Sequence, residues 1–337
     1  MNTIWKWRLL PLIAVMTFLL TGCGSDTLSA MIPRGPVAQE QYDLIKLSFF
    51  IMTFVIVVVF VIYVYVMIRF RQRKNQVGLP KQVEGNHTLE FIWTAIPILL
   101  LIVLAVPTLT YTFKHATDYS KDPDAIKIKV TANQFWWQFE YPELGIVTAQ
   151  DMVVPAGKKI VIELTAADVK HSFWVPSLAG KTDNNPGQTN RFTIEADEID
   201  TFKGRCAELC GASHSLMNFN VVSVSEEDFD AWIAKLKSPA VTPANASAGE
   251  QLFKDNCLSC HAVSVDGLGL GPNLNGFANR TLVAGVLEHT PENIAKWIAN
   301  PQDQKPGNKM PAFGQSLGGP LDDNQINDIV TYLNNLK

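Results

Sequence analysis

The sequence has few thiols and few imidazoles, with five cysteines and six histidines among its 337 residues. Charge is also sparse: only 18% of the residues are charged, and the formal net charge at pH 7 is −4. Lysine and arginine form no basic patch outside one short segment, residues 69–90, which argues against a nucleic-acid partner. Charge is missing altogether from three apolar runs, and these runs organise the first third of the chain.

The first apolar run predicts export. Lys6 and Arg8 precede the uncharged residues 9–20, and Cys23 follows shortly afterwards. This run is too short to span a bilayer as a helix, so we expect a signal peptide over residues 1–22. Residues 20–23, Leu-Thr-Gly-Cys, resemble the bacterial lipobox, in which the cysteine becomes the lipidated first residue. An ordinary signal with an incidental cysteine is the alternative.

The other two runs, residues 47–68 and 91–113, predict membrane spans. Each is long enough to cross a hydrocarbon core of about 30 Å at about 1.5 Å per residue. We therefore expect a two-helix transmembrane hairpin within residues 23–118. The basic segment 69–90 between the runs should lie in the cytoplasm, which places everything after residue 113 on the outer face of the membrane.

A β-rich domain is expected over residues 119–237. Residues 126–130 alternate between apolar and charged side chains, and residues 153–164 and 220–224 have similar strand patterns. Short strands separated by turn residues favour a Greek-key sandwich, which matches the cupredoxin-like class.

An all-α domain is expected over residues 249–337. Helical patterns occur at residues 249–257, 291–299 and 322–336. The preceding stretch, residues 238–248, is rich in proline, alanine and serine, so we expect an extended linker that tethers this domain to the β-rich one.

The helical domain contains a c-type haem attachment signature, Cys257-Leu258-Ser259-Cys260-His261. Cys257 and Cys260 can form thioethers to one porphyrin, while His261 ligates the iron. Met310 is the only methionine after His261 and lies in a Pro/Gly loop, so we expect it to be the sixth ligand, with His289 as competitor. A thioredoxin-like pair needs no adjacent histidine, and no second cysteine pair follows to complete a zinc site.

The β-rich domain contains a second group of potential ligands. Cys206, Cys210, His214 and Met217 lie within twelve residues, and His171 is the only other histidine of this domain. A single blue-copper centre uses one cysteine, whereas two thiolates can be shared by two coppers, each with its own histidine. Zinc would leave Met217 unexplained, and a disulfide would leave both histidines unused. The sequence favours binuclear copper, with zinc and a disulfide as alternatives.

Taken together, the chain resembles subunit II of a haem–copper cytochrome c oxidase of the caa3 type, in which a cytochrome c domain is fused to the C-terminus. The resemblance rests on Cys206-x-Glu208-x-Cys210-x3-His214-x2-Met217, His171-Ser172-Phe173-Trp174-Val175-Pro176-Ser177, and Glu90-x2-Trp93-Thr94. It implies that the coppers of a CuA centre are held by Cys206, Cys210, His171, His214, Met217 and the backbone carbonyl of Glu208.

Three further residues acquire expected roles from the resemblance. The Glu208 carboxylate would reach a magnesium ion shared with subunit I. Glu90 matches a carboxylate near the entrance of a proton pathway, although a snorkelling interfacial residue is the alternative. Phe135 stands where many members carry tryptophan, so electrons are expected to enter through Trp136 or through direct contacts of the haem domain.

The resemblance implies an electron-transfer subunit in the cytoplasmic membrane, with its copper and haem domains outside. Haem c would accept electrons from an external cytochrome c or other donor and pass them through CuA to subunit I, where oxygen is reduced to water. Neither span has histidines to hold another haem, so subunit I and other oxidase subunits are required partners. The alternatives are a CuA subunit of a nitric oxide reductase and a membrane-anchored copper-binding module. A quinol oxidase subunit is disfavoured because that relative lacks the copper ligands.

Overall fold

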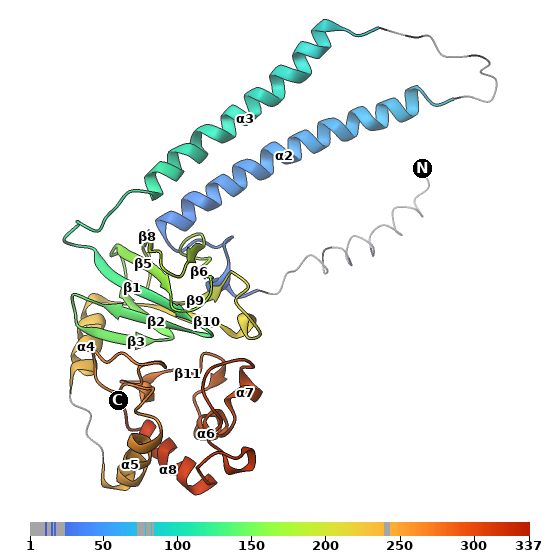
Figure 1. Cartoon of the computed structure of the whole chain (residues 1–337). Helices are drawn as coiled ribbons and strands as arrows, with labels where there is room; N and C mark the ends of the chain where they lie inside the picture. Colours follow the sequence, from blue (N-terminus) through green and yellow to red (C-terminus); the bar gives the residue numbers. More distant parts are fainter. Residues whose placement is uncertain are drawn as a thin grey trace.

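The structure is a computed structural model that describes residues 24–72, 84–238 and 243–337, together with residues 11, 15, 17, 78 and 82. Figure 1 shows three parts in chain order: a long helical hairpin, a β domain and a small C-terminal helical domain. The predicted lipidation site Cys23 lies outside the described residues, as does nearly all of the predicted signal peptide.

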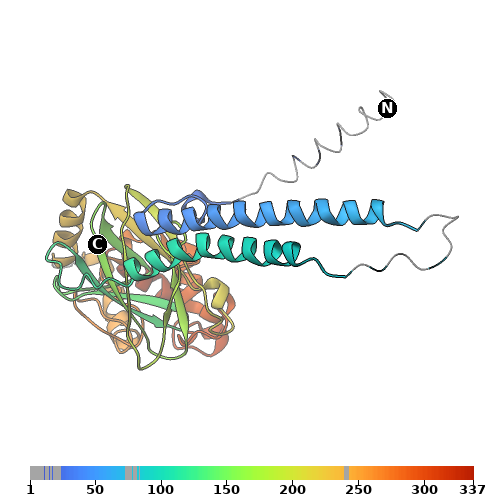
Figure 2. The same cartoon turned by 90° about the horizontal axis from the view of Figure 1, so that it is seen from above.

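The hairpin consists of α2 (Pro36–Arg69) and α3 (His87–His115), preceded by the short helix η1 (Asp26–Leu28). Both helices are long and apolar enough to cross a membrane, by length and composition, and they run side by side (Figure 2). Helix α2 begins eleven residues before the predicted span, because Pro36 fits the first helical turn and Ala38 is buried against Leu178. At the domain end, Glu40 pairs with Lys114 and His115 and so joins the two helices.

The β domain is a sandwich of two five-stranded sheets. One sheet has the order β3-β2-β1-β5-β8, formed by Ile146–Ala149, Trp136–Tyr141, Ile126–Asn133, Ile160–Ala166 and Asn190–Ile194. The other has the order β4-β10-β9-β6-β7, formed by Asp151–Pro155, Asn218–Val224, Asp200–Cys206, His171–Trp174 and Thr182–Asn184. Trp137, Phe173 and Phe219 pack between the sheets with ring centroids 4.5 to 5.6 Å apart. The predicted sandwich is confirmed.

Helix α4 (Glu226–Lys237) follows the sandwich and packs on it through Phe229, whose ring stacks on Trp232. The sequence patterns did not predict this helix. The expected linker over residues 238–248 is helical at its end, where η3 (Ala244–Ala246) leads into α5.

The C-terminal domain is built mainly from α5 (Ser247–Asn256), α6 (Pro291–Ala299) and α8 (Asp323–Leu333), close to the predicted ranges. The remaining elements are short, namely η4 (Phe277–Asn279), α7 (Pro301–Gln304), η5 (Gln315–Leu317) and a ribbon of β11 (Leu282–Val283) with β12 (Leu287–Glu288). The predicted last helix ends earlier than expected, and the ribbon is an addition to an otherwise helical domain.

The β domain and the C-terminal domain lie directly against each other (Figure 1). The Val147 amide donates a 2.7 Å hydrogen bond to the Val265 carbonyl, and the Asn275 side chain donates one of 2.9 Å to the Leu236 carbonyl. The hairpin projects from the other end of the β domain. The sandwich therefore separates the membrane-length helices from the C-terminal domain.

Candidate metal centres

Two neighbouring strands bring the predicted copper ligands together. Strand β9 ends at Cys206, and β6 begins at His171 and pairs with β9 through Phe173 and Cys206. The loop after β9 carries Cys210, and the short helix η2 (His214–Leu216) places His214 just before Met217 and β10. His171 and Met217 are fully buried, so these ligands are held by packing from all sides.

The separations between ligand atoms fit metal ions. Cys206 Sγ lies 3.8 Å from Cys210 Sγ and 3.8 Å from His171 Nδ1, whereas Cys210 Sγ lies 3.6 Å from His214 Nδ1 and 3.8 Å from Met217 Sδ. An ion with bonds of about 2.2 Å keeps its ligands about 3.6 Å apart in a tetrahedron. Both cysteines are free, which does not fit the disulfide alternative. One histidine lies beside each sulfur, as two ions sharing the sulfur pair require.

The two thiols share a proton, which prepares one of them to bind a metal. The hydrogen bond between the two sulfurs lowers the pKa of the Cys206 thiol, with help from His171 and against the effect of burial. The same hydrogen bond and burial raise the pKa of Cys210. A thiol of lowered pKa loses its proton readily to a metal, and the bound metal would displace the remaining proton of the pair.

The Asp168 carboxylate contacts the His171 ring nitrogen that does not face Cys206. The carboxylate lies 2.9 Å from His171 Nε2, which leaves Nδ1 facing Cys206. Burial alone would lower the pKa of His171, but the bonds to Asp168 and Cys206 outweigh it and raise the pKa. A carboxylate that fixes the tautomer and orientation of a ligating imidazole is the usual second layer of a metal site. The sequence analysis missed Asp168, although its place three residues before His171 was a signal.

The backbone around the sulfur pair is also fixed by distant side chains. The Glu208 carbonyl lies 3.3 Å from Cys206 Sγ, as a further ligand would. The Gln134 side chain donates a 2.5 Å hydrogen bond to the Cys210 carbonyl, and the Trp137 indole lies 3.4 Å from the Met217 carbonyl. These contacts hold the loop to β2 and to the segment before it.

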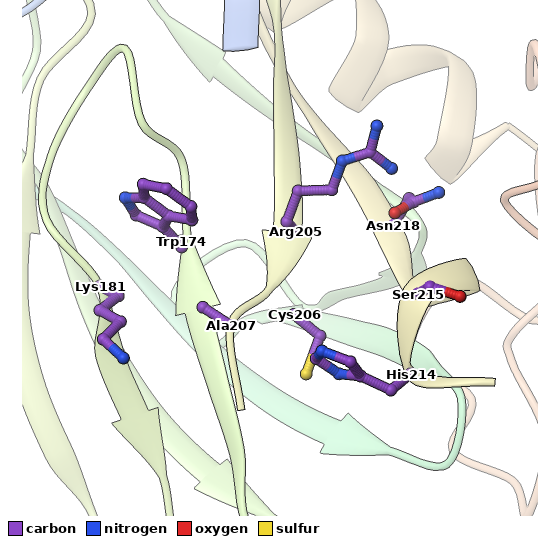
Figure 3. Close-up of a pocket in the computed structure, with 8 residues that line it drawn as sticks. All are labelled: Trp174, Lys181, Arg205, Cys206, Ala207, His214, Ser215 and Asn218. Carbon is purple, nitrogen blue, oxygen red and sulfur yellow. The ribbon is translucent and has the colours of Figure 1, made fainter. Parts of the chain in front are cut away.

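A cavity of about 620 Å³ opens beside the sulfur pair. Figure 3 shows its lining, in which Cys206 and His214 lie together while Lys181, Arg205 and Trp174 surround them. Next to this opening, Leu209 is 79% exposed at the tip of the loop between the cysteines.

The haem attachment segment has the geometry that an iron ligand needs. His261 Nδ1 donates to the Pro272 carbonyl at 2.8 Å, which leaves Nε2 free for a metal. Burial lowers the pKa of His261 and keeps the imidazole neutral. A Cβ at Gly271 would lie 2.7 Å from the His261 ring, so this glycine lets the backbone pass against the imidazole. Cys257 and Cys260 precede His261 in one turn, and burial raises the pKa of Cys257 to about 11.

Met310 packs against the core of the C-terminal domain, and its backbone is fixed by a 2.8 Å bond to the Asn308 side chain. His289, the competitor, contacts Asn334 through Nε2 at 3.1 Å and packs on Phe277. His289 is thus held by partners of its own, and Met310 remains the predicted axial ligand.

Two further predicted site residues lie in α3 and β2. Glu90 lies in the first turn of α3, 3.2 Å from His87 Nδ1, at the end of the hairpin remote from the β domain (Figure 1). Trp136 is half-buried at the start of β2, directly after the buried Phe135.

A buried cluster of thiols, imidazoles and a thioether, together with a haem-attachment domain and two membrane-length helices, defines a membrane-anchored electron-transfer protein. Three family models match the chain: "Cytochrome C oxidase subunit II, transmembrane domain" over residues 33–111, "Cytochrome C oxidase subunit II, periplasmic domain" over 144–224, and "Cytochrome c" over 246–337. The last two models imply copper in the β domain and haem in the C-terminal domain.

Curated relatives extend this similarity over the whole chain. Cytochrome c oxidase subunit 2 of Bacillus sp. (strain PS3) is 47% identical over 98% of each chain, and that of Bacillus subtilis (strain 168) is 44% identical over 98% of each. The chain belongs to the cytochrome c oxidase subunit II family, which confirms the predicted resemblance and fold class. Quinol oxidase subunit 2 of Bacillus spizizenii is 36% identical but covers only 68% of this chain and 73% of its own.

Among solved structures, the periplasmic domain of subunit II of cytochrome oxidase from Bradyrhizobium japonicum is 33% identical to this chain. It covers 32% of this chain and 91% of its own, with a TM-score of 0.31. The family assignment rests on the sequence matches.

Proposed function

We propose that this chain is the electron-entry subunit of a haem–copper terminal oxidase. The observation that carries the proposal is the contact between the two ligand-bearing loops. Lys309, next to Met310, pairs with Asp168 at 3.2 Å, and Asp168 contacts the copper ligand His171. Ser213, next to His214, donates a 2.7 Å hydrogen bond to the Pro306 carbonyl. The loop that carries Met310 thus lies directly on the copper loop.

This proposal assigns ligand residues to each metal group. The binuclear copper would be held by Cys206, Cys210, His171, His214, Met217 and the carbonyl of Glu208. Haem c would be attached through Cys257 and Cys260 and ligated by His261 and Met310. When bound, these groups supply one-electron carriers that take electrons from an external cytochrome c or other donor toward subunit I, where oxygen is reduced to water.

The cavity beside the copper ligands is the proposed contact with subunit I. Its Lys181 and Arg205 offer positive charge to an acidic segment of the partner, and the exposed Leu209 offers an apolar anchor. The half-exposed Glu208 carboxylate would share a magnesium ion across this contact. Other oxidase subunits would complete the complex around α2 and α3.

We place the chain in the cytoplasmic membrane, with residues 69–90 inside and both metal domains outside. Cleavage before Cys23 and acylation of its thiol would add a second anchor. Glu90 then lies at the inner end of α3, where a proton pathway could begin.

Trp136 is proposed as the residue through which electrons reach the copper. A Trp136→Phe oxidase should transfer electrons from haem c to copper more slowly after flash reduction of the haem. Unchanged transfer would leave the direct loop contacts as the route.

Purified oxidase containing this chain tests the main proposal. We expect covalently bound haem and a copper signal in which one unpaired electron is shared by two nuclei. Flash-reduced haem should reduce the copper within the same molecule. Zinc or exchangeable single copper at the site would contradict the proposal. Consumption of nitric oxide instead of oxygen would indicate the nitric oxide reductase.

A further inference from the structure

Lys305 is the most deeply buried lysine in the contact between the two domains. It follows α7 and precedes Met310 by five residues, and only 2% of its surface is exposed. Its backbone is anchored, because its amide donates to the Pro301 carbonyl at 2.9 Å and its carbonyl accepts from the Asn308 side chain at 2.7 Å. The Lys305 side chain therefore starts from a fixed backbone position in the loop that carries Met310.

The Lys305 ammonium bridges the two domains. Nζ donates a 2.7 Å hydrogen bond to the carbonyl of Phe135 in the β domain and another of 2.7 Å to the carbonyl of Ala284 in the C-terminal domain. The ion pairs of the described residues do not include Lys305, so backbone carbonyls alone receive this charge. Burial accordingly lowers the pKa of Lys305 to about 7, against the nearby Cys210, which raises it.

Phe135 connects this contact to the copper loop. Its neighbour Gln134 donates to the Cys210 carbonyl at 2.5 Å, and a Cβ at Gly211 would lie 3.0 Å from the Phe135 ring. A Cβ at Gly307 would likewise lie 3.7 Å from the same ring and 3.4 Å from Cβ of Ala212, so the Lys305 loop and the copper loop pack on one side chain and on each other. These contacts thus fix the position of the loop that carries Met310 relative to Cys210.

The interdomain ion pair is less able to define one pose. Lys309 is 69% accessible in its pair with Asp168, and water and salt screen such an exposed charge. The buried Lys305 amine is different, because a pose that removes either carbonyl leaves a donor unsatisfied in a dry contact, whether or not the amine is protonated. Alternative dockings are therefore disfavoured more strongly by Lys305 than by Lys309.

We propose that Lys305 is a positioning residue for electron transfer between the haem and copper domains, which holds the Met310 loop against the Phe135 segment in a single docked pose. This inference rests on the proposed function. It assigns Lys305 no contact with either metal, so its loss should change the rate of transfer and not the metal sites.

The test compares Lys305→Met with Lys305→Gln and with the control Lys296→Met in the assembled oxidase. Met keeps the length of the side chain without a donor, Gln keeps a donor without the charge, and Lys296 is an exposed residue of α6. After flash reduction of haem c, the transfer rate to copper should fall about tenfold in Lys305→Met, the usual effect of losing one buried hydrogen bond. It should fall less in Lys305→Gln and remain unchanged in Lys296→Met.

Three additional measurements separate positioning from general damage: the haem c reduction potential, the copper paramagnetic spectrum and the thermal midpoint. We expect all three to match the unsubstituted oxidase. Equal transfer rates in Lys305→Met and the unsubstituted oxidase would overturn this inference alone, as would a slow rate accompanied by an altered potential or copper spectrum. An unsubstituted oxidase without haem-to-copper transfer would overturn the proposed function as well.

Discussion

Asp168 accepts hydrogen bonds from both sides of the domain contact. His171 Nε2 lies 2.9 Å away, the Gln134 and Val169 amides each donate at 2.8 Å, and Lys309 Nζ donates at 3.2 Å. Burial would raise the pKa of this carboxyl, but the donors outweigh it and hold the pKa well below its usual range. Asp168 therefore remains a carboxylate at neutral pH, and it keeps His171 oriented.

Replacing Asp168 by asparagine should weaken copper binding. The amide removes the negative charge that orients His171, and such changes behind a metal ligand usually cost about 10- to 100-fold in affinity. Competition with a copper chelator measures this loss. Asp230→Asn, on the exposed side of α4, is the matched control and should retain full affinity. Equal affinities in the two variants would show that Asp168 does not support the ligand.

The ligands were predictable from the sequence, whereas the residues behind them were not. Cys206, Cys210 and Met217 lie within one short segment, and His171 was the only other histidine available in its domain. Lys305 lies between glutamine and proline in a stretch that reads as an exposed loop, and its partner Phe135 is 170 residues away. No local pattern encodes such a contact, because it exists only after two domains have packed together.

At the scale of secondary-structure elements, β9 and β10 form the support of the copper loop. They pair antiparallel, with Phe219 opposite Gly204, and the Phe219 ring lies over that glycine. A Cβ at Gly204 would come within 2.2 Å of the ring. The glycine thus makes room for the aromatic cluster of Trp137, Phe173 and Phe219 below the metal ligands.

Gly204→Ala should destabilise the β domain without removing a ligand. The added methyl group overpacks the cluster, which typically costs about 1–3 kcal/mol of unfolding free energy. Denaturant unfolding followed by the copper absorption band measures the change. Lys203→Ala, at the adjacent exposed position, should remain close to the original stability. A neutral effect of Gly204→Ala would mean that Phe219 moves aside without cost.

Element boundaries were predictable where a single physical cause sets them. Charge-free runs identified the apolar parts of α2 and α3, and alternation identified β1. Helix α2 extends further because the Leu178 carbonyl of the β domain accepts from Ala38 in its first turn, and the Ser177 carbonyl accepts from Arg34 just before it, which the apolar run does not reveal. Likewise, the ribbon β11–β12 is too short to leave a pattern in the sequence.

At the scale of the whole molecule, the three parts follow the proposed route of electrons. The hairpin lies at one end, the C-terminal domain at the other, and the β domain stands between them (Figure 1). Charge entering at the peripheral domain must therefore cross the domain contact before it reaches the membrane side. The properties of that contact, and of Lys305 within it, should therefore control the rate of electron transfer through the molecule.

The rate of transfer across this contact should therefore depend on pH. Burial lowers the pKa of Lys305 to about 7 in the docked form, from the ordinary 10.5 of an exposed lysine, despite the opposing effect of Cys210. The docked form then binds fewer protons than the undocked form between these two values. Raising the pH above about 7 should strengthen docking, by up to about tenfold per pH unit, whereas at lower pH docking should be weak and constant.

Flash-reduction rates between pH 6 and pH 9, a range of about three units around the lowered pKa, measure this dependence. In the unsubstituted oxidase, transfer from haem c to copper should accelerate as the pH rises. Lys305→Met has no titrating group at this position, so the part of the dependence that comes from docking should vanish. If both oxidases respond identically to pH, the proton is released elsewhere, and Lys305 does not govern how the two domains meet.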